Sequence, residues 1–151
     1  MLFQRALLAF LALPGVVAIL LPPFIGDIDP NGWQGTSLGA LVLIIGFVLL
    51  IWCVRDFYVA GKGTLAPWDP PEHLVILGLY KYTRNPMYVA VLIMLAGWAL
   101  LYGSVFLSIY AVAFAFIFHQ RVVRNEEPWL SKTFGADWEE YSESVPRWVI
   151  R

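Results

Sequence analysis

Two polar segments of the sequence hold nearly all of the groups that could do chemistry. They are residues 55–88 and residues 119–151. The C-terminal one contains two adjacent carboxylates, Glu126 and Glu127, shortly after the cations Arg121 and Arg124. Carboxylates next to cations at a membrane interface can bind a charged ligand, but carboxylates in a first helical turn also stabilise the helix dipole. The spacing alone leaves both roles open.

The local sequence around these carboxylates predicts the start of a new helix. Asn125 is a suitable N-cap, Pro128 is tolerated in a first turn, and the helix would run toward Thr133. The middle segment is instead rich in proline and glycine, which predicts a shaped loop. Its Gly-Lys-Gly-Thr sequence at residues 61–64 lacks the earlier glycine of a phosphate-binding loop, so we do not expect a nucleotide phosphate there.

The elements that must position these segments are apolar helices. The chain has 151 residues, of which 60% are hydrophobic and only 14% are charged. A soluble domain is charged at about a quarter of its positions, so this composition excludes one. The net charge of −1 argues against a nucleic-acid partner. The single cysteine, Cys53, excludes an intrachain disulfide and a multi-thiolate metal site, and we expect no metal.

Four apolar blocks predict an all-α membrane bundle with four crossings. A crossing needs about 20 residues, and the blocks are roughly Leu2–Ile25, Leu38–Val54, Met87–Tyr102 and Val105–Phe118. The last two form a hairpin, and Pro14-Gly15 is expected to kink the first. One domain results, with two N-terminal spans in residues 1–58, a loop in 59–86, the hairpin in 87–124 and a tail in 125–151.

The distribution of cations predicts the orientation of this integral, multi-pass bundle. All ten Lys and Arg residues lie in the N-terminus, the middle connection or the C-terminal tail, whereas the first connection carries only Asp27 and Asp29. By the positive-inside rule, both termini and both polar segments are therefore cytoplasmic. The membrane is either the cytoplasmic membrane or the endoplasmic reticulum.

Several short motifs follow one another along the two polar segments. They are Leu74-Val75, Gly78-x-Tyr80, Arg84-Asn85-Pro86-x-Tyr88, Glu126-Glu127-x-x-Leu130, Phe134-Gly135, Tyr141 and Val145-Pro146-Arg147. Their order and spacing resemble the isoprenylcysteine carboxyl methyltransferase and phospholipid methyltransferase family. The resemblance covers roughly residues 55–148, and one departure is Asn85, where many members have histidine.

The resemblance implies S-adenosylmethionine as cofactor on the cytoplasmic side, and a lipidic acceptor that enters from the bilayer. The cofactor offers an ammonium, a carboxylate, an adenine ring and a sulfonium, so its site needs acidic, cationic and aromatic groups. The cofactor-binding positions implied are Glu72, His73, Leu74, Val75, Tyr80, Arg84, Asn85, Pro86, Tyr88, Glu126 and Glu127. Among these, Glu126 and Glu127 suit the ammonium or ribose. Arg84 and the backbone N–H groups of residues 72–75 suit the carboxylate, and Tyr80 and Tyr88 suit the adenine or sulfonium.

The acceptor decides which residues act as catalytic groups. A carboxylate arrives ionised and needs a cation to orient it, which points to Arg121 or Arg124. An amine must lose a proton, and then His73 or His119 is of interest as a base. The partners expected are membrane lipids and a hydrophobic or lipidated acceptor, most simply a carboxylate of the isoprenylcysteine type.

Other functions compatible with the sequence are phospholipid amine methylation and a non-catalytic lipid-binding subunit. A small transporter is disfavoured because no ionisable residue lies deep within an expected span, where such residues usually mark a transport pathway.

Overall fold

The computed structural model describes residues 11–30, 32–61 and 73–149, and all regular structure within these residues is helical. The all-α expectation is confirmed. In chain order the elements are η1 (Leu11–Leu20), α2 (Leu21–Asp27), α3 (Leu38–Gly61), η2 (Gly78–Lys81), α4 (Pro86–Tyr102), α5 (Val105–Arg121), η3 (Val122–Glu126), α6 (Glu127–Phe134) and α7 (Ala136–Ser144). The segments η1 and η3 are π-helical, and η2 is a 3₁₀ turn.

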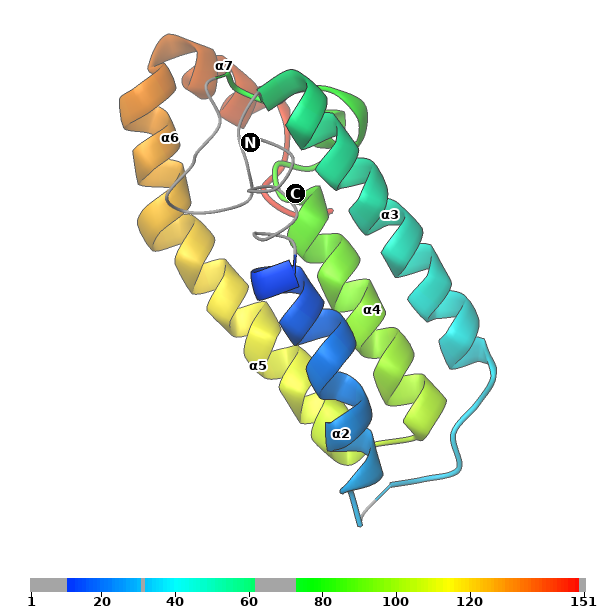
Figure 1. Ribbon diagram of the computed structural model, residues 1–151. Helices are drawn as coiled ribbons and strands as arrows, with labels where there is room; N and C mark the ends of the chain where they lie inside the picture. Colours follow the sequence, from blue (N-terminus) through cyan, green and yellow to red (C-terminus); the bar gives the residue numbers. More distant parts are fainter. Residues whose placement is uncertain (1–10, 31, 62–72, 150–151) are drawn as a thin grey trace.

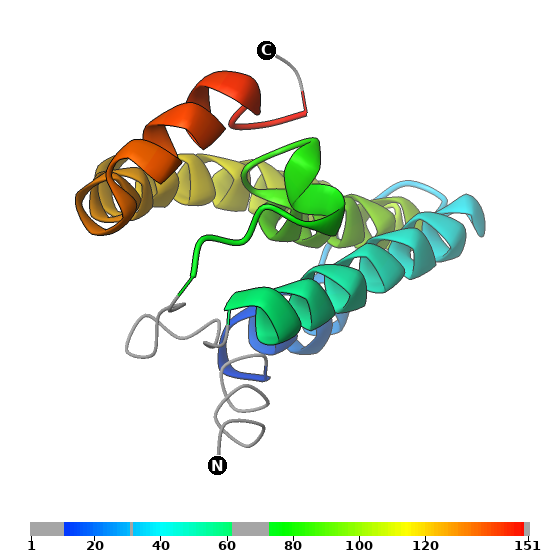
Figure 2. The same cartoon turned by 90° about the horizontal axis from the view of Figure 1, so that it is seen from above.

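The long helices lie side by side in an elongated bundle (Figure 1). Helix α4 packs against both α3 and α5, and α2 packs against α4 and α5. Helices α6 and α7 lie at one end, where α3 finishes and α4 begins (Figures 1 and 2). We call this the polar end, because it carries residues 73–88 and 119–149 and therefore the described parts of both polar segments.

The helices have the apolar character of a membrane protein. Among the described residues, two helices are long and apolar enough to cross a bilayer, at Leu38–Ala60 and Val105–Phe134. Shorter apolar helices occupy Pro14–Asp27 and Pro86–Tyr102. Helices therefore form in all four expected apolar blocks. The second of the long helices has 30 residues, about 45 Å of α-helix, and so extends well past a hydrocarbon core of about 30 Å.

Small residues let α3 and α4 approach closely. A Cβ atom on Gly97 of α4 would lie 2.6 Å from the backbone nitrogen of Leu43 of α3, and one on Gly46 would lie 2.7 Å from the Met94 side chain. Around this contact Leu50, Met94 and Leu95 form a fully buried core. Helix association in lipid depends on such close van der Waals contact, since there is little hydrophobic driving force between helices.

At the end of the bundle opposite the polar end, the Asp29 carboxylate binds the N-terminus of α5. One oxygen of Asp29 accepts from the Ser104 hydroxyl at 2.6 Å and from the Phe106 amide at 2.8 Å, at the N-terminus of α5. Gly103 ends α4 with a φ of +61°, which favours glycine. This contact fixes the first connection to the hairpin tip.

Two local expectations are refined by the structure. Pro14 lies inside η1, so the proline is accommodated by a π-helical stretch. The expected helix start at Asn125 is wrong, because Asn125 lies within η3 and the chain stays helical from Val105 to Phe134. Pro128 provides a reason for the π-helical turn, since it lacks an N–H group and its ring crowds the preceding turn.

Candidate functional site

The site lies at the polar end, where the two adjacent glutamates separate into two different ion-pair clusters. Glu126 accepts hydrogen bonds from the Tyr88 hydroxyl and, at 2.7 Å, from Nε of Arg121. Glu127 contacts Arg84 at 3.0 Å and is held by Arg147 through two bonds of 2.8 and 2.7 Å. The two adjacent carboxylates therefore have different partners and different surroundings.

The π-helical turn explains how Arg121 and Glu126 can meet. They are five residues apart, and in an α-helix of 3.6 residues per turn such residues project about 140° from each other. A π-helix instead bonds each amide to the carbonyl five residues earlier, and the Glu127 amide does bond to the Val122 carbonyl. The wider turn brings Glu126 onto the side of Arg121, and π-helical turns of this kind are frequent at functional sites.

Arg84 is the most buried cation of the second cluster. Its guanidinium lies 5.4 Å from the centre of the Trp138 ring, and its Nε atom is buried without a hydrogen-bond partner among the residues that the structure describes. Burial lowers the pKa of Arg84, whereas Glu127 partly offsets this effect. Two arginines share one carboxylate here, which leaves an excess of positive charge. Such a cluster is suited to a further anionic group.

A set of main-chain contacts joins the C-terminal tail to the start of α4. The Arg84 amide donates to the Pro146 carbonyl at 2.9 Å, and Asn85 donates its side-chain amide to the Arg147 carbonyl at 3.0 Å. The Thr83 hydroxyl donates to the same carbonyl at 3.1 Å. These contacts explain the Val-Pro-Arg motif, because they place the Arg147 side chain beside Glu127.

The tail makes a further side-chain contact with α5. Trp148 donates from its indole nitrogen to Nδ1 of His119 at 3.3 Å. His119 therefore helps to fix the tail.

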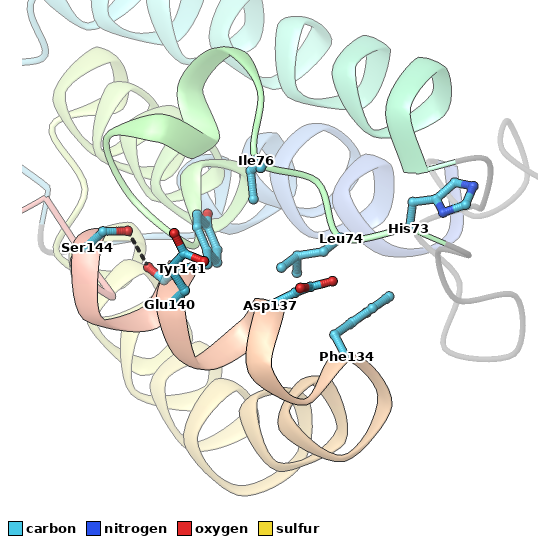
Figure 3. A pocket seen from close by; sticks show the side chains of 8 residues that line it. All are labelled: His73, Leu74, Ile76, Phe134, Asp137, Glu140, Tyr141 and Ser144. Atoms are coloured by element: carbon cyan, nitrogen blue, oxygen red, sulfur yellow. Dashed lines mark hydrogen bonds between the residues drawn. The ribbon is translucent and has the colours of Figure 1, made fainter.

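A cleft of about 500 Å³ opens between the 73–76 segment and helices α6 and α7 (Figure 3). One wall carries His73, Leu74 and Ile76, and the other wall carries Phe134, Asp137, Glu140, Tyr141 and Ser144. Four of these residues lie three or four positions apart on α7, so they form one stripe of the helix. The cleft combines two carboxylates with aromatic surfaces.

Tyr141 connects the cleft to the rest of the site. Its hydroxyl donates to the Tyr80 carbonyl at 2.7 Å. Burial raises the pKa of Tyr141, and the Arg84 guanidinium partly offsets that rise. Tyr141 thus interacts electrostatically with Arg84 and also lines the cleft.

A second, apolar groove of about 450 Å³ runs along α4. It is lined by Val89, Leu92, Ile93 and Ala96, together with Trp148 and Val149 of the tail. The first of these residues, Val89, follows Tyr88 directly in the sequence of α4.

The structure brings most of the residues expected from the sequence to this polar end. His73 and Leu74 line the cleft, and Arg84, Tyr88, Glu126 and Glu127 form the two clusters. Glu72 lies outside the described residues.

The remaining expected residues have supporting positions. Val75 and Tyr80 are buried in a small core with Cys53, and Pro86 is buried at the start of α4. Of the two candidate arginines, Arg121 is half-buried and paired with Glu126, whereas Arg124 is exposed.

Sequence reasoning missed the acidic part of the cleft. Asp137, Glu140 and Ser144 had no role in the expected site, although Phe134 and Tyr141 belong to the recognised motifs. The repeat of polar residues at positions 137, 140 and 144 is the signal that could have found them, because it places them on one face of a helix.

Comparison with known proteins gives one family match and a few distant relatives. Residues 35–137 match the family model described as phospholipid methyltransferase, which confirms the resemblance. The cobalt-zinc-cadmium resistance protein CzcN of Cupriavidus metallidurans is 27% identical over 127 residues, 79% of this chain and 54% of that protein. The Delta(14)-sterol reductase TM7SF2 of Mus musculus is 33% identical over 97 residues, 63% of this chain and 23% of that protein.

A third relative is an uncharacterised protein of Haemophilus influenzae, which is 29% identical over 63 residues, 42% of this chain and all of that protein. The chain thus spans only about half of CzcN and about a quarter of the reductase. No solved structure shows significant similarity. The family match covers about two thirds of the chain, from α3 to the start of α7, and includes the cleft segment, both glutamates and Arg84. This membrane protein therefore belongs to the phospholipid methyltransferase family.

Proposed function

We propose that the chain is a methyltransferase that moves a methyl group from S-adenosylmethionine to a lipidic acceptor at the membrane surface. The observation that carries the proposal is the convergence of the Glu126 and Glu127 clusters with the acidic and aromatic cleft at the polar end, in a chain whose residues 35–137 match the family. When bound, the cofactor supplies a methyl group already activated by a sulfonium. The protein then needs to supply binding, orientation and electrostatics.

The side chains of the polar end suit the parts of the cofactor. Arg84 has a buried Nε without a partner and belongs to a cluster with excess positive charge, which suits the cofactor carboxylate. Asp137 and Glu140 can accept hydrogen bonds from ribose hydroxyls, and the Phe134 ring offers an apolar surface for adenine. Glu126 would accept from the ammonium.

The acceptor side of the site is proposed at Arg121 and the α4 groove. Arg121 presents a planar guanidinium that can hold a carboxylate through two bonds. The apolar groove that starts beside Tyr88 suits a hydrocarbon tail. An acceptor with a carboxylate and an apolar tail, of the isoprenylcysteine type, fits this pair of surfaces. In this proposal the polar end faces the cytoplasm, all four apolar helices cross the membrane, and nucleic acid is not a partner.

Phospholipid amine methylation is the second candidate, and the description of the matching family favours it. An amine must be deprotonated before it attacks the methyl group. Of the two histidines of the chain, His73 lines the cleft, and His119 accepts a hydrogen bond from Trp148. The rate with an amine acceptor should therefore rise with pH, whereas a carboxylate acceptor needs no base.

Cofactor binding to the purified protein in detergent tests the proposal directly. We expect saturable binding of S-adenosylmethionine by calorimetry, and transfer of its labelled methyl group into a lipid-extractable product. Glu140→Gln should weaken binding several-fold through loss of a charge-assisted hydrogen bond. The matched control is Glu139→Gln, because Glu139 is exposed on the same helix and does not line the cleft. Absence of saturable binding to the folded wild-type protein would reject the proposal.

A further inference from the structure

The two groups that the proposed function assigns to different ligands are bound to each other in the structure. Glu126 is assigned to the ammonium of the cofactor, and Arg121 is assigned to the anionic end of the acceptor. In the structure the Nε atom of Arg121 donates to Oε1 of Glu126 at 2.7 Å. A ligand that binds either residue through its charge must therefore compete with the other residue.

We propose that the Arg121–Glu126 ion pair is an autoinhibitory contact that makes cofactor and carboxylate acceptor bind cooperatively. This inference rests on the proposed function. Binding of the ammonium to Glu126 releases Arg121, which can then take the acceptor carboxylate without first breaking an ion pair. Because binding linkage is reciprocal, the acceptor must improve cofactor binding by the same factor.

The contrast with the neighbouring glutamate indicates which ion pair can open. Glu127 is engaged through both oxygens by Arg147 and also by Arg84, and its side chain is only 16% exposed. Glu126 and Arg121 are joined by one hydrogen bond between these two residues, and their side chains are 31% and 38% exposed. Ion pairs with this much solvent contact are weak, so an incoming charged ligand can replace one partner at low cost.

The Arg121–Glu126 ion pair depends on the backbone geometry of the π-helical turn η3. Residues five positions apart would point to different sides of an α-helix, so the pair depends on the wider turn that precedes Pro128. Tyr88 adds a second donor to the same oxygen of Glu126, and its ring stacks on Phe118 with centroids 4.5 Å apart. Glu126 is therefore held against the first turn of α4 by Tyr88, whose ring is in turn supported by Phe118 of α5.

The coupling can be measured with two unreactive probes. S-adenosylhomocysteine keeps the ammonium and carboxylate of the cofactor but has no methyl group to transfer. N-acetyl-S-farnesylcysteine provides a carboxylate on an isoprenoid tail. We expect the farnesyl probe to bind the wild-type protein about five-fold more tightly when S-adenosylhomocysteine is saturating, which is at the lower end of typical coupling between sites.

Two variants separate this coupling from a structural role of the pair. In Glu126→Gln the amide cannot neutralise Arg121, so the farnesyl probe should bind at its tighter affinity with or without S-adenosylhomocysteine. In Arg121→Ala the carboxylate of Glu126 is released, so S-adenosylhomocysteine should bind about two- to five-fold more tightly than to the wild type. A pair that only stabilises the fold predicts the reverse, because its loss would weaken binding. Glu139→Gln should retain the full coupling.

The outcomes distinguish this inference from the proposed function. If S-adenosylhomocysteine fails to bind the wild-type protein, the proposed function and this inference fall together. If it binds but changes the affinity of the farnesyl probe by less than two-fold, or if the probe does not bind, the coupling is wrong and the cofactor site stands. If Glu126→Gln does not fold, the affinity of Arg121→Ala for S-adenosylhomocysteine decides alone, and weaker binding overturns the coupling.

Discussion

The side-chain amide of Asn85 donates to the main-chain carbonyl of Arg147 at 3.0 Å, across 62 positions of sequence. The family resemblance leads us to expect histidine at this position, and the contact gives a physical reason why asparagine can replace it. The Arg147 carbonyl accepts this N–H in addition to the Thr83 hydroxyl, and an imidazole could supply an N–H donor in place of the amide. The bond holds the tail so that the Arg147 side chain meets Glu127.

The effect of replacing Asn85 on stability and on cofactor binding should therefore depend on whether the new side chain carries a hydrogen-bond donor. Asn85→Ala should destabilise the protein by about 0.5–1.5 kcal/mol and weaken cofactor binding, since one of the three bonds that hold the tail and Arg147 in place would be lost. Asn85→His should retain most of both properties. Thermal unfolding in detergent and calorimetric binding measure the two effects. Equal losses in both variants would show that the donor is not what matters.

The two adjacent glutamates should respond differently to mutation. Glu127→Ala leaves Arg84, whose side chain is 12% exposed, without its carboxylate, so we expect a loss of stability of about 1–3 kcal/mol. Glu126→Ala removes a more exposed group and should change stability less, but it should weaken binding of S-adenosylmethionine about ten-fold or more. Melting temperature and calorimetric binding of both variants test this contrast. Normal cofactor binding by folded Glu126→Ala would leave Glu126 with a structural role alone.

The helical bundle could be predicted from the sequence because long apolar segments are enough to indicate membrane helices. Long apolar blocks can satisfy their backbone groups in lipid only as helices, so Leu38–Gly61 and Val105–Arg121 could be expected from hydropathy. The polar motifs likewise indicated which segments meet at one end.

The different ion-pair partners of Glu126 and Glu127 could not be predicted from hydropathy or from the motifs. It depends on a π-helical turn, and neither propensity nor periodicity distinguishes such a turn from an α-helix. The favourable N-cap chemistry of Asn125 gave the wrong helix start, because the helix continues through that position, where Glu126 bonds to Tyr88 of α4 and to Arg121 one π-helical turn earlier. The cleft was missed because it requires the 73–76 segment to pack against α7, a contact between residues about 65 positions apart.

Cysteine accessibility tests the proposed orientation in the membrane. The native Cys53 is buried, so we expect it to react little with the thiol reagent. Gln34 lies in the first connection and Ser131 in α6, and both are exposed. Gln34→Cys should react with an impermeant thiol reagent added outside intact cells, or from the lumenal side, whereas Ser131→Cys should react only after permeabilisation. The opposite pattern would place the cofactor site away from the cytoplasm.

Alkaline pH should destabilise the protein through its buried tyrosines. Burial raises the pKa of Tyr141 and of Tyr80 above the ordinary value of about 10. The unfolded chain therefore loses these protons first, so their contribution to stability is complete below about pH 10 and is lost as pH rises toward the folded values. The melting temperature should therefore fall as the pH rises above about 10.

Substitution of Tyr141 should make that decline less steep. Tyr141→Phe removes one of the titrating groups, although loss of its bond to the Tyr80 carbonyl should cost about 0.5–1.5 kcal/mol at neutral pH. Tyr82→Phe is the matched control because Tyr82 is 74% exposed. An unchanged pH slope in Tyr141→Phe would mean that other groups cause the alkaline loss.

The two arginines near the end of the long helix should differ in their effect on methyl transfer. Arg121 is half-buried beside Glu126, whereas Arg124 is exposed and suited to lipid head groups. We expect Arg121→Ala to slow methyl transfer to a carboxylate lipid at least ten-fold without weakening cofactor binding. Arg121→Lys should recover only part of the rate, because lysine lacks the planar fork that grips a carboxylate. Arg124→Ala should stay within about two-fold of the wild type, since it loses only an exposed charge.

Single-turnover rates with matched carboxylate and amine lipids identify the acceptor class. These rates isolate the chemical step from product release, so a lower rate at saturating cofactor reports on acceptor positioning. If the natural acceptor is an amine, removal of the Arg121 cation should leave the rate unchanged or raise it, because the cation would repel a positively charged lipid. The amine rate should then also rise with pH as the acceptor loses its proton. A carboxylate rate that neither arginine substitution slows would show that no arginine of this helix orients the acceptor.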